Sequence, residues 1–154
     1  MEAIKIKRPE TTSADFPLPA YATPGSSGLD LRAHLPLAYQ QKGIRLPPSE
    51  RLLVSSGFII EIPSDYEGQI RPRSGLAVKF GVGIINSPGT IDSDYRGEIK
   101  IALINLGSED FYVRHGERIA QLVIAPVVRV VFKIEKQLSQ SDRNEFGFGS
   151  TGNY

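Results

Sequence analysis

The stretch GVGIINSPGTIDSDYRGEIKIALINL, residues 81–106, indicates the fold most strongly. Apolar, β-compatible residues stand on both sides of the dipeptide Pro88-Gly89, which is typical of a tight turn. The pattern predicts a hairpin-like element whose tip carries Asn86, Asp92, Asp94 and Tyr95. These polar and aromatic side chains are more than a structural turn requires, so the same stretch is also a candidate functional segment.

Short apolar runs continue on both sides of this hairpin. Fifteen glycines and eleven prolines separate them, and no run sustains a helical period for long. The further runs predicted as strands are RLLVSSGFIIEI, RIAQLVIAPVV and VVRVVFKIE, at residues 51–62, 118–128 and 127–135. In the last of these Val128, Val130, Phe132 and Ile134 alternate onto one face, which makes it the clearest predicted strand. Many short strands at this spacing favour an antiparallel sandwich, jelly roll or barrel.

One short helix is expected at residues 74–81, with Ser74 as its N-cap and Gly81 as its terminator. The sequence turns polar from Leu138 onwards. We therefore expect one packed domain over residues 1–136, followed by a tail over residues 137–154.

Composition restricts the function classes. The 154 residues are 40% hydrophobic and 23% charged, which is typical of a soluble globular domain. The net charge of +1 argues against a broad nucleic-acid or membrane surface, so any anion site must be local. There is no cysteine, which excludes disulfides and thiolate chemistry. No apolar run has the length of a signal peptide or a membrane span, so a cytoplasmic location is expected.

Three familiar site types fail on their context. GFGSTG has the glycine spacing of a dinucleotide fingerprint, but only two residues follow it, so no helix can begin there. The DSDYRG stretch begins like a calcium loop, but it has Arg96 at the fifth position and Leu103 where a glutamate is required. The two histidines, His34 and His115, are too few and too isolated for a histidine metal site or a catalytic triad.

Five segments remain, and each combines small residues with charged or aromatic ones. They are PGSSGLDLRA (24–33), RPRSGLA (71–77), NSPGTIDSDYRGE (86–98), GERIAQL (116–122) and RNEFGFGSTGNY (143–154). The last segment cannot bury a core of its own. It is either a frayed chain end or a flap that orders over a ligand.

Residue chemistry suggests ligands for these segments. Arg73 precedes the start of the predicted helix at Ser74-Gly75, where a guanidinium, a hydroxyl and free N–H groups suit a phosphate; an ordinary capped helix with a solvated arginine is the alternative. Gln121 is either a buried polar linker or a phosphate contact.

The hairpin tip offers groups for a nucleoside. The Asn86 amide can match the edge of a pyrimidine, and Tyr95 can offer a flat face to a sugar. Asp92 could take a proton from water if it were partly buried, although simple solvation of the loop explains both aspartates equally well.

With these segments in this order, the chain resembles the trimeric dUTP pyrophosphatase (dUTPase) family. LDL, PRSGLA, GTIDSDYRGE, GERIAQL and GFGSTG carry the resemblance, which extends from Ala22 to Asn153. It implies an antiparallel β jelly roll with one short α-helix, assembled as a homotrimer with three active sites at subunit interfaces. It also implies hydrolysis of dUTP to dUMP and pyrophosphate with Mg²⁺, which limits uracil incorporation into DNA and supplies dUMP for dTMP synthesis. No nucleic-acid or membrane partner is expected.

The resemblance also implies roles for individual residues. Asp92 matches the general base that activates the attacking water, and Asp30 matches an outer-shell acid that orients waters bound to Mg²⁺. Because an ordinary carboxylate is a weak base, catalysis should depend more on positioning and charge neutralisation. Tyr95 matches the residue under the deoxyribose. The residues implied to bind substrate in the body of the chain are Arg73, Ser74, Gly75, Asn86, Thr90, Ile91, Tyr95, Lys100 and Gln121.

Of these, Lys100 is expected on a strand that returns beside residues 83–86, where backbone groups would complete the pairing to uracil. In the tail, Arg143 would contact the γ-phosphate and Phe148 would stack on uracil, while Gly149, Ser150 and Thr151 would wrap the phosphates.

The tail departs from the family pattern at two positions. Asn144 and Phe146 stand where the family generally has glycines. Asparagine tolerates left-handed backbone, so position 144 is a mild change. Phe146 either packs on a neighbouring subunit or hinders closure of the flap.

Two other functions fit the same fold. A dCTP deaminase-like enzyme would need an acid–base group near the base; the hairpin tip has no glutamate suited to that role, and Glu98 is left open as an alternative. A catalytically silent jelly-roll binding module would not need Asp92, Tyr95 and Arg143 together.

Overall fold

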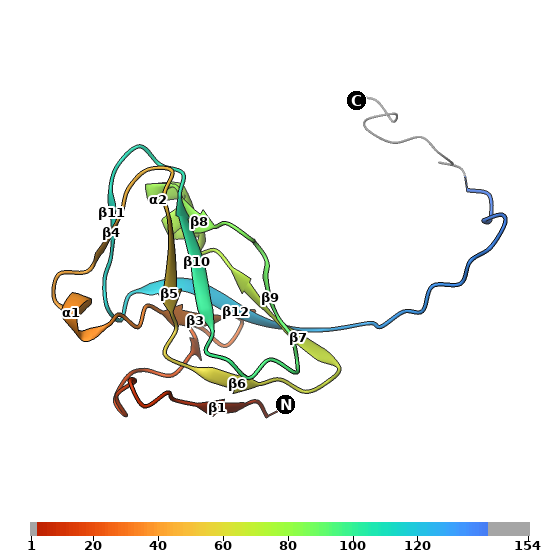
Figure 1. Cartoon of the computed structure of the whole chain (residues 1–154), viewed down its shortest axis with the longest axis horizontal. Helices are drawn as coiled ribbons and strands as arrows, with labels where there is room; N and C mark the ends of the chain where they lie inside the picture. The colour runs from red at the N-terminus through yellow and green to blue at the C-terminus, as the bar shows by residue number, and fades with distance from the viewer. Residues whose placement is uncertain (1–2, 142–154) are drawn as a thin grey trace.

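The computed structural model describes residues 3–141, and within them lie twelve β-strands and two short helices (Figure 1). The strands are β1 (Lys5–Lys7), β2 (Ala20–Tyr21), β3 (Leu29–Arg32), β4 (Ile44–Leu46), β5 (Arg51–Ser55), β6 (Ile59–Glu61), β7 (Tyr66–Arg71), β8 (Val82–Ile84), β9 (Gly89–Ile91), β10 (Lys100–Asn105), β11 (Phe111–Val113) and β12 (Arg118–Pro126). The helices are α1 (Leu37–Gln40) and α2 (Ser74–Phe80).

All pairings between these strands are antiparallel. The largest sheet has the order β2-β3-β12-β7-β9, and a second sheet has the order β5-β10-β8. Two short ribbons, β1-β6 and β11-β4, complete the domain. The antiparallel all-β jelly roll expected from the sequence is therefore confirmed.

The hydrophobic core lies between the two larger sheets. Leu31, Ile70 and Leu122 of the five-stranded sheet belong to the same buried cluster as Val54 and Ile101 of the three-stranded sheet. Strand β10 alternates buried and less buried side chains along its length. Each large aliphatic side chain buried in this way contributes about 1.5–3 kcal/mol relative to its exposed state.

The predicted helix is present as α2, with one correction at its start. Arg73, not Ser74, occupies the N-cap position: its backbone is extended, and its carbonyl accepts hydrogen bonds from the N–H groups of Leu76 and Ala77, both at 3.1 Å. Gly81 ends the helix as predicted, with a left-handed φ of 68°. Helix α1 was not predicted, because a single turn shows no helical period. In residues 3–141 no helix is long and apolar enough to cross a membrane.

The hairpin predicted around Pro88-Gly89 is present only in part. Strand β8 pairs with β10 as expected, but β9 leaves β8 and pairs with β7 of the larger sheet. In this register Gly83 pairs with Ile104. Lys100 therefore lies beyond the paired stretch instead of opposite residues 83–86, and it pairs with Ser55 of β5 on its other side.

The strand predicted at residues 127–135 is absent from the described chain, and this prediction is wrong. Strand β12 ends at Pro126, and residues 127–141, which we call the arm, contain no helix or strand. Figure 1 shows the arm running away from the body of the domain. A strand needs a neighbouring strand for its backbone groups, and β12, whose pairing with β7 ends at Pro126, is the last strand among residues 3–141. The domain boundary at residue 136 stays a prediction.

Candidate active site

Three of the five segments meet in one pocket between β3, α2 and β12, which we call the cradle. It has a volume of about 260 Å³. Its lining residues are Ala22, Ser26, Ser27, Gly28, Asp30, Arg73, Ser74, Gly75, Arg118 and Gln121. The fold thus brings together five of the predicted site residues from distant parts of the sequence, namely Asp30, Arg73, Ser74, Gly75 and Gln121.

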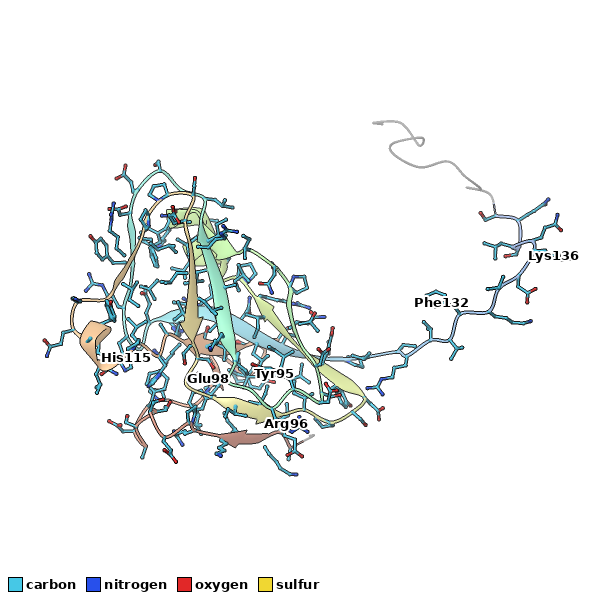
Figure 2. All side chains as sticks on the ribbon, in the orientation of Figure 1. Tyr95, Arg96, Glu98, His115, Phe132 and Lys136 are labelled. Atoms are coloured by element: carbon cyan, nitrogen blue, oxygen red, sulfur yellow. The ribbon has the colours of Figure 1, made fainter. Side chains whose placement is uncertain are left out.

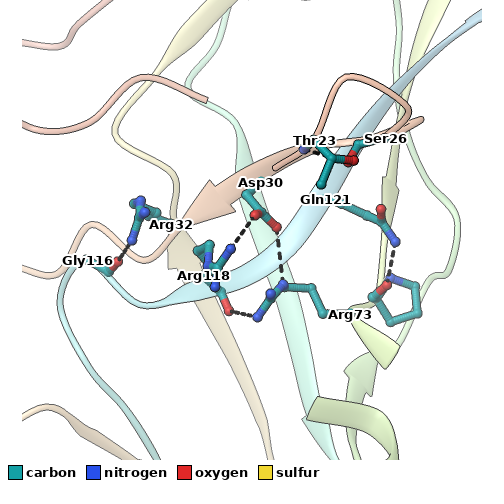
Figure 3. Close-up of polar contacts among 9 residues, drawn as sticks. Thr23, Ser26, Asp30, Arg32, Arg73, Gly116, Arg118 and Gln121 are labelled. Atoms are coloured by element: carbon teal, nitrogen blue, oxygen red, sulfur yellow. Dashed lines mark hydrogen bonds and ion pairs between the residues drawn. The ribbon is translucent and has the colours of Figure 1, made fainter. Parts of the chain in front are cut away.

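Two arginines contact one carboxylate in the cradle (Figure 3). Asp30 lies 3.2 Å from Nε of Arg73 and 3.0 Å from Nη1 of Arg118, and its side chain is only 17% exposed. Arg73 also donates to the carbonyl oxygen of Arg118, at 3.1 Å. The two guanidinium groups offset the cost of burying the carboxylate and leave one positive charge in excess. That excess charge favours an anion in the pocket.

The other polar groups of the cradle are held in place or open to solvent. Gln121 donates from Nε2 to the carbonyl oxygen of Pro72 at 3.0 Å, and its second N–H is available for a ligand. A Cβ at Gly28 would lie 2.6 Å from Oε1 of Gln121, so a larger residue there would displace this amide. Ser74 and Gly75 are exposed at the first turn of α2, where N–H groups have no intrahelical acceptor.

Arg118 is a charged residue of the cradle that was not predicted from sequence. It stands three residues before Gln121, and in a regular strand two such residues point to opposite faces. In β12 the pairing with β3 shifts register between Arg118 and Ala120, and Ile119 and Ala120 are both buried. This bulge brings Arg118 onto the same face as Gln121. The positive charge of Arg118 within GERIAQL was a signal for an anion-binding residue. The face to which its side chain points depends on the bulge and could not be predicted.

Asp92 lies in a different pocket of about 570 Å³. This second pocket is lined by Ser64, Tyr66, Glu67, Asp92, Ser93, Asp94, Val127 and Arg129. The separation follows from strand register: Arg71 of β7 pairs with Gln121, whereas Gly68 of β7 pairs with Ile91, just before Asp92. Three residues of strand span about 10 Å. Within one chain, Asp92 and the cradle therefore do not line the same pocket.

The other predicted residues of the hairpin lie in β9 and in the loops on either side of it. Thr90 and Ile91 are in β9, and the Asn86 amide lies against Gly89, where an added Cβ would meet Nδ2 at 3.1 Å. Tyr95 is 43% exposed and donates from its hydroxyl to the carbonyl oxygen of Glu98 at 3.0 Å. Arg143, Phe148, Gly149, Ser150 and Thr151 lie outside the described residues.

Comparisons with known proteins identify the family of this chain. The family model described as dUTPase matches residues 14–152. The deoxyuridine 5'-triphosphate nucleotidohydrolase of Aquifex aeolicus (strain VF5) is 56% identical over 149 residues, which cover 97% of this chain and 95% of that protein. The protein of the same name from Rhizobium meliloti (strain 1021) is 56% identical over 135 residues, covering 88% and 82%.

A solved structure shares the fold. The G164S mutant of the Staphylococcus bacteriophage 80alpha dUTPase, solved with dUpNHpp, has a TM-score of 0.80 and 25% identity over 99% of both chains. Because the family model spans most of the sequence and the relatives are more than half identical over most of both chains, the chain belongs to the dUTPase family.

Proposed function

We propose that this chain is a dUTP diphosphatase, which hydrolyses dUTP to dUMP and pyrophosphate in the cytoplasm. The cradle is the observation that carries the proposal. Two guanidinium groups, an amide, a hydroxyl and the first turn of a helix surround a single carboxylate there. Such a set of donors suits a chain of phosphates, and membership of the dUTPase family identifies the nucleotide.

In this proposal the cradle binds the phosphates. The Arg73 guanidinium, the Ser74 hydroxyl and the N–H of Gly75 donate hydrogen bonds to phosphate oxygens. Gln121 adds its second N–H from β12. These contacts hold the triphosphate in place for attack and offset its charge.

Mg²⁺ fits the site as a partner of the phosphates. Both oxygens of Asp30 are engaged by arginines, so Asp30 suits a role through metal-bound water better than direct ligation. No group of three or more histidines, cysteines, aspartates or glutamates among residues 3–141 is placed to hold a metal ion. The substrate phosphates would therefore be the main ligands, as is common for this ion. When bound, Mg²⁺ supplies charge neutralisation.

Asp92 is the proposed general base. It would take a proton from a water molecule whose oxygen attacks the α-phosphorus, while the bond to the bridging oxygen breaks and pyrophosphate leaves. The turn that carries Asp92 is closed by a hydrogen bond from the N–H of Tyr95 to the Asp92 carbonyl oxygen, at 3.1 Å. This bond fixes the backbone of Asp92 relative to that of Tyr95.

The hairpin residues would choose the base and the sugar. The Asn86 amide would pair with the uracil edge, with Thr90, Ile91 and Lys100 nearby. Rejection of cytosine would follow from mismatched donors and acceptors, since a buried polar group left unpaired costs about 1–3 kcal/mol. Tyr95 would lie under the deoxyribose and leave no room for a 2′-hydroxyl.

The complete site would form only in a homotrimer. The cradle and Asp92 line separate pockets of one chain, so a cradle of one subunit needs the Asp92 segment of another. The arm supports the same assembly. Its side chains at Val128, Val131, Phe132 and Ile134 are 86% to 99% exposed, which is unusual for large apolar residues unless another chain covers them.

The last residues would close the site. Arg143 would contact the γ-phosphate and Phe148 would stack on uracil, while Gly149, Ser150 and Thr151 would wrap the phosphates. Asn144 and Phe146 stand in this segment where the family generally has glycines. Phe146 adds the larger side chain of the two.

Product analysis with dCTP and dUTP separates this function from its two alternatives. We expect dUMP and pyrophosphate from dUTP and no product from dCTP. Formation of dUTP or dUMP from dCTP would favour the deaminase-like enzyme. Failure of the purified trimer to release pyrophosphate from dUTP with Mg²⁺ would favour the silent binding module.

A further inference from the structure

A chain of hydrogen bonds ties the loop that carries Tyr95 to strand β5. The Tyr95 hydroxyl donates to the carbonyl oxygen of Glu98 at 3.0 Å. The Ser55 hydroxyl in turn donates to Oε1 of Glu98, and the N–H of Gly57 donates to Oγ of Ser55 at 2.9 Å. Glu98 is therefore held at its side chain while its backbone holds the tyrosine. Figure 2 shows Tyr95 and Glu98 at neighbouring positions beside β10.

The backbone around Glu98 is fixed by the same two segments. The N–H of Ser56 donates to the carbonyl oxygen of Ile99, and the N–H of Ile99 donates to the carbonyl oxygen of Phe58, both at 2.9 Å. Ser56, Phe58 and Ile99 are at most 1% exposed. Buried and fully paired backbone of this kind moves little, so Glu98 is attached to a rigid base.

The Tyr95 ring also packs against the backbone of Gly97. A Cβ at Gly97 would lie 2.9 Å from Cε2 of Tyr95 and closer still to its hydroxyl end, so the ring rests directly on the glycine backbone. Arg96 closes the loop by donating to the carbonyl oxygens of Ser93 and Tyr95, at 2.6 and 2.9 Å. The hydrogen bond to Glu98 and the contact with Gly97 together set the height and tilt of the ring.

The Glu98 carboxylate does not lie in the pocket of Asp92. It lines a separate cavity with Ser55, His34, Leu53 and Lys100. Its Oε1 is occupied by the Ser55 hydroxyl. This placement disfavours the acid–base role that a deaminase would require of it and favours a role in positioning.

We propose that Glu98 is a positioning residue for sugar selectivity, which acts by fixing the Tyr95 ring through the Ser55–Glu98 hydrogen bond. The proposal rests on the proposed function, in which this ring excludes a 2′-hydroxyl. Steric exclusion works only if the ring cannot retreat, because the penalty for the larger sugar is otherwise relieved by motion. Loss of the anchor should therefore weaken discrimination against UTP more than it weakens turnover of dUTP.

The test compares kcat/KM for dUTP and UTP in wild type, Glu98→Ala, Ser55→Ala and Glu98→Gln. We expect the ratio of kcat/KM for dUTP to kcat/KM for UTP to fall about tenfold in Glu98→Ala, because one hydrogen bond is lost. Ser55→Ala, which removes only a hydroxyl group, should lower the ratio by the same factor. Glu98→Gln should restore most of the ratio, because its amide oxygen can still accept from Ser55. Glu10→Ala, at an exposed glutamate, is the matched control and should leave both values unchanged.

An unchanged ratio in folded Glu98→Ala and Ser55→Ala would overturn the proposal. So would a ratio that falls in Glu98→Gln as far as in Glu98→Ala, because the Ser55 hydrogen bond would then be irrelevant. These outcomes leave the proposed function intact, which fails only if the wild-type protein does not hydrolyse dUTP.

Discussion

At the scale of single residues, the charge of the cradle depends on Asp30 and the two arginines that contact it. Asp30 alone would be an unfavourable neighbour for a triphosphate. With Arg73 and Arg118 within 3.2 Å of it, the cluster is cationic and also fixes Arg73 in position before substrate arrives. Preorganisation of this kind avoids a reorganisation cost when charge develops in the transition state.

Replacing Asp92 by asparagine should separate binding from turnover. The amide keeps the size of the side chain but cannot take a proton from water, so we expect kcat to fall about a thousandfold or more. Affinity for a non-hydrolysable dUTP analogue, measured by calorimetry, should stay within a few fold of wild type. Asp94→Asn is the matched control, because Asp94 lines the same pocket, and it should turn over normally. Normal turnover by Asp92→Asn would remove Asp92 as the base.

Stability should fall as pH drops through the range in which free histidine titrates. Burial, and to a lesser degree the charge of nearby His34, lower the pKa of His115 below its ordinary value of 6.5. Nδ1 of His115 accepts the N–H of Leu35 at 3.1 Å, and protonation would break this bond. Between the lowered pKa and 6.5 the unfolded chain binds more protons than the folded one, so stability rises with pH there and is complete above 6.5.

Melting temperature measured against pH in wild type and His115→Asn checks this expectation. Asparagine offers an acceptor to Leu35 but does not titrate, so its curve should be flatter below pH 6.5. The comparison uses the slopes of melting temperature against pH and not the absolute values. The reason is that the His115 ring, whose centroid lies 5.2 Å from that of Phe16, contributes packing whose loss lowers stability at every pH. Parallel curves would show that His115 does not carry the effect.

At the scale of secondary-structure elements, the β-strand character of β10 and the glycine after α2 could be predicted from sequence, because both depend on local residue preferences. The bulge in β12 could not, since it is visible only in the pairing with β3. The pairing of β9 with β7 of the larger sheet could not be predicted for the same reason. The arm shows the opposite case: apolar side chains recur at every second position from Val128 to Ile134, but alternation specifies a face and not a partner strand.

The end of α2 is the element-level feature most sensitive to substitution. At Gly81 an added Cβ would meet Cα of Gly107 at 2.7 Å, and φ is 68°. We expect Gly81→Ala to lower the free energy of unfolding by more than about 3 kcal/mol, from left-handed strain plus overpacking. Gly116 also has a positive φ, of 76°, but open space around it, so Gly116→Ala should cost only about 1 kcal/mol. Urea unfolding measures both, and equal losses would mean that the contact with Gly107 is unimportant.

At the scale of the whole molecule, the two separate pockets predict that inactive chains can complement each other. Arg73→Ala removes the cradle and Asp92→Asn removes the base, and each variant alone should be inactive. If a site takes its cradle and its base from different subunits, co-expressed variants form mixed trimers in which about a quarter of the sites are intact. Pyrophosphate release from dUTP by the purified mixture should recover accordingly. No recovery in trimers shown to be mixed would place both groups in one chain.

The most direct test of the proposed function is hydrolysis of dUTP, dCTP, dTTP and UTP, each with Mg²⁺ and with pyrophosphate as the measured product. We expect rapid release from dUTP alone, because the Asn86 segment selects uracil and the Tyr95 ring excludes the ribose 2′-hydroxyl. Comparable release from UTP would contradict the sugar assignment. Absence of release from dUTP would contradict the proposed function itself.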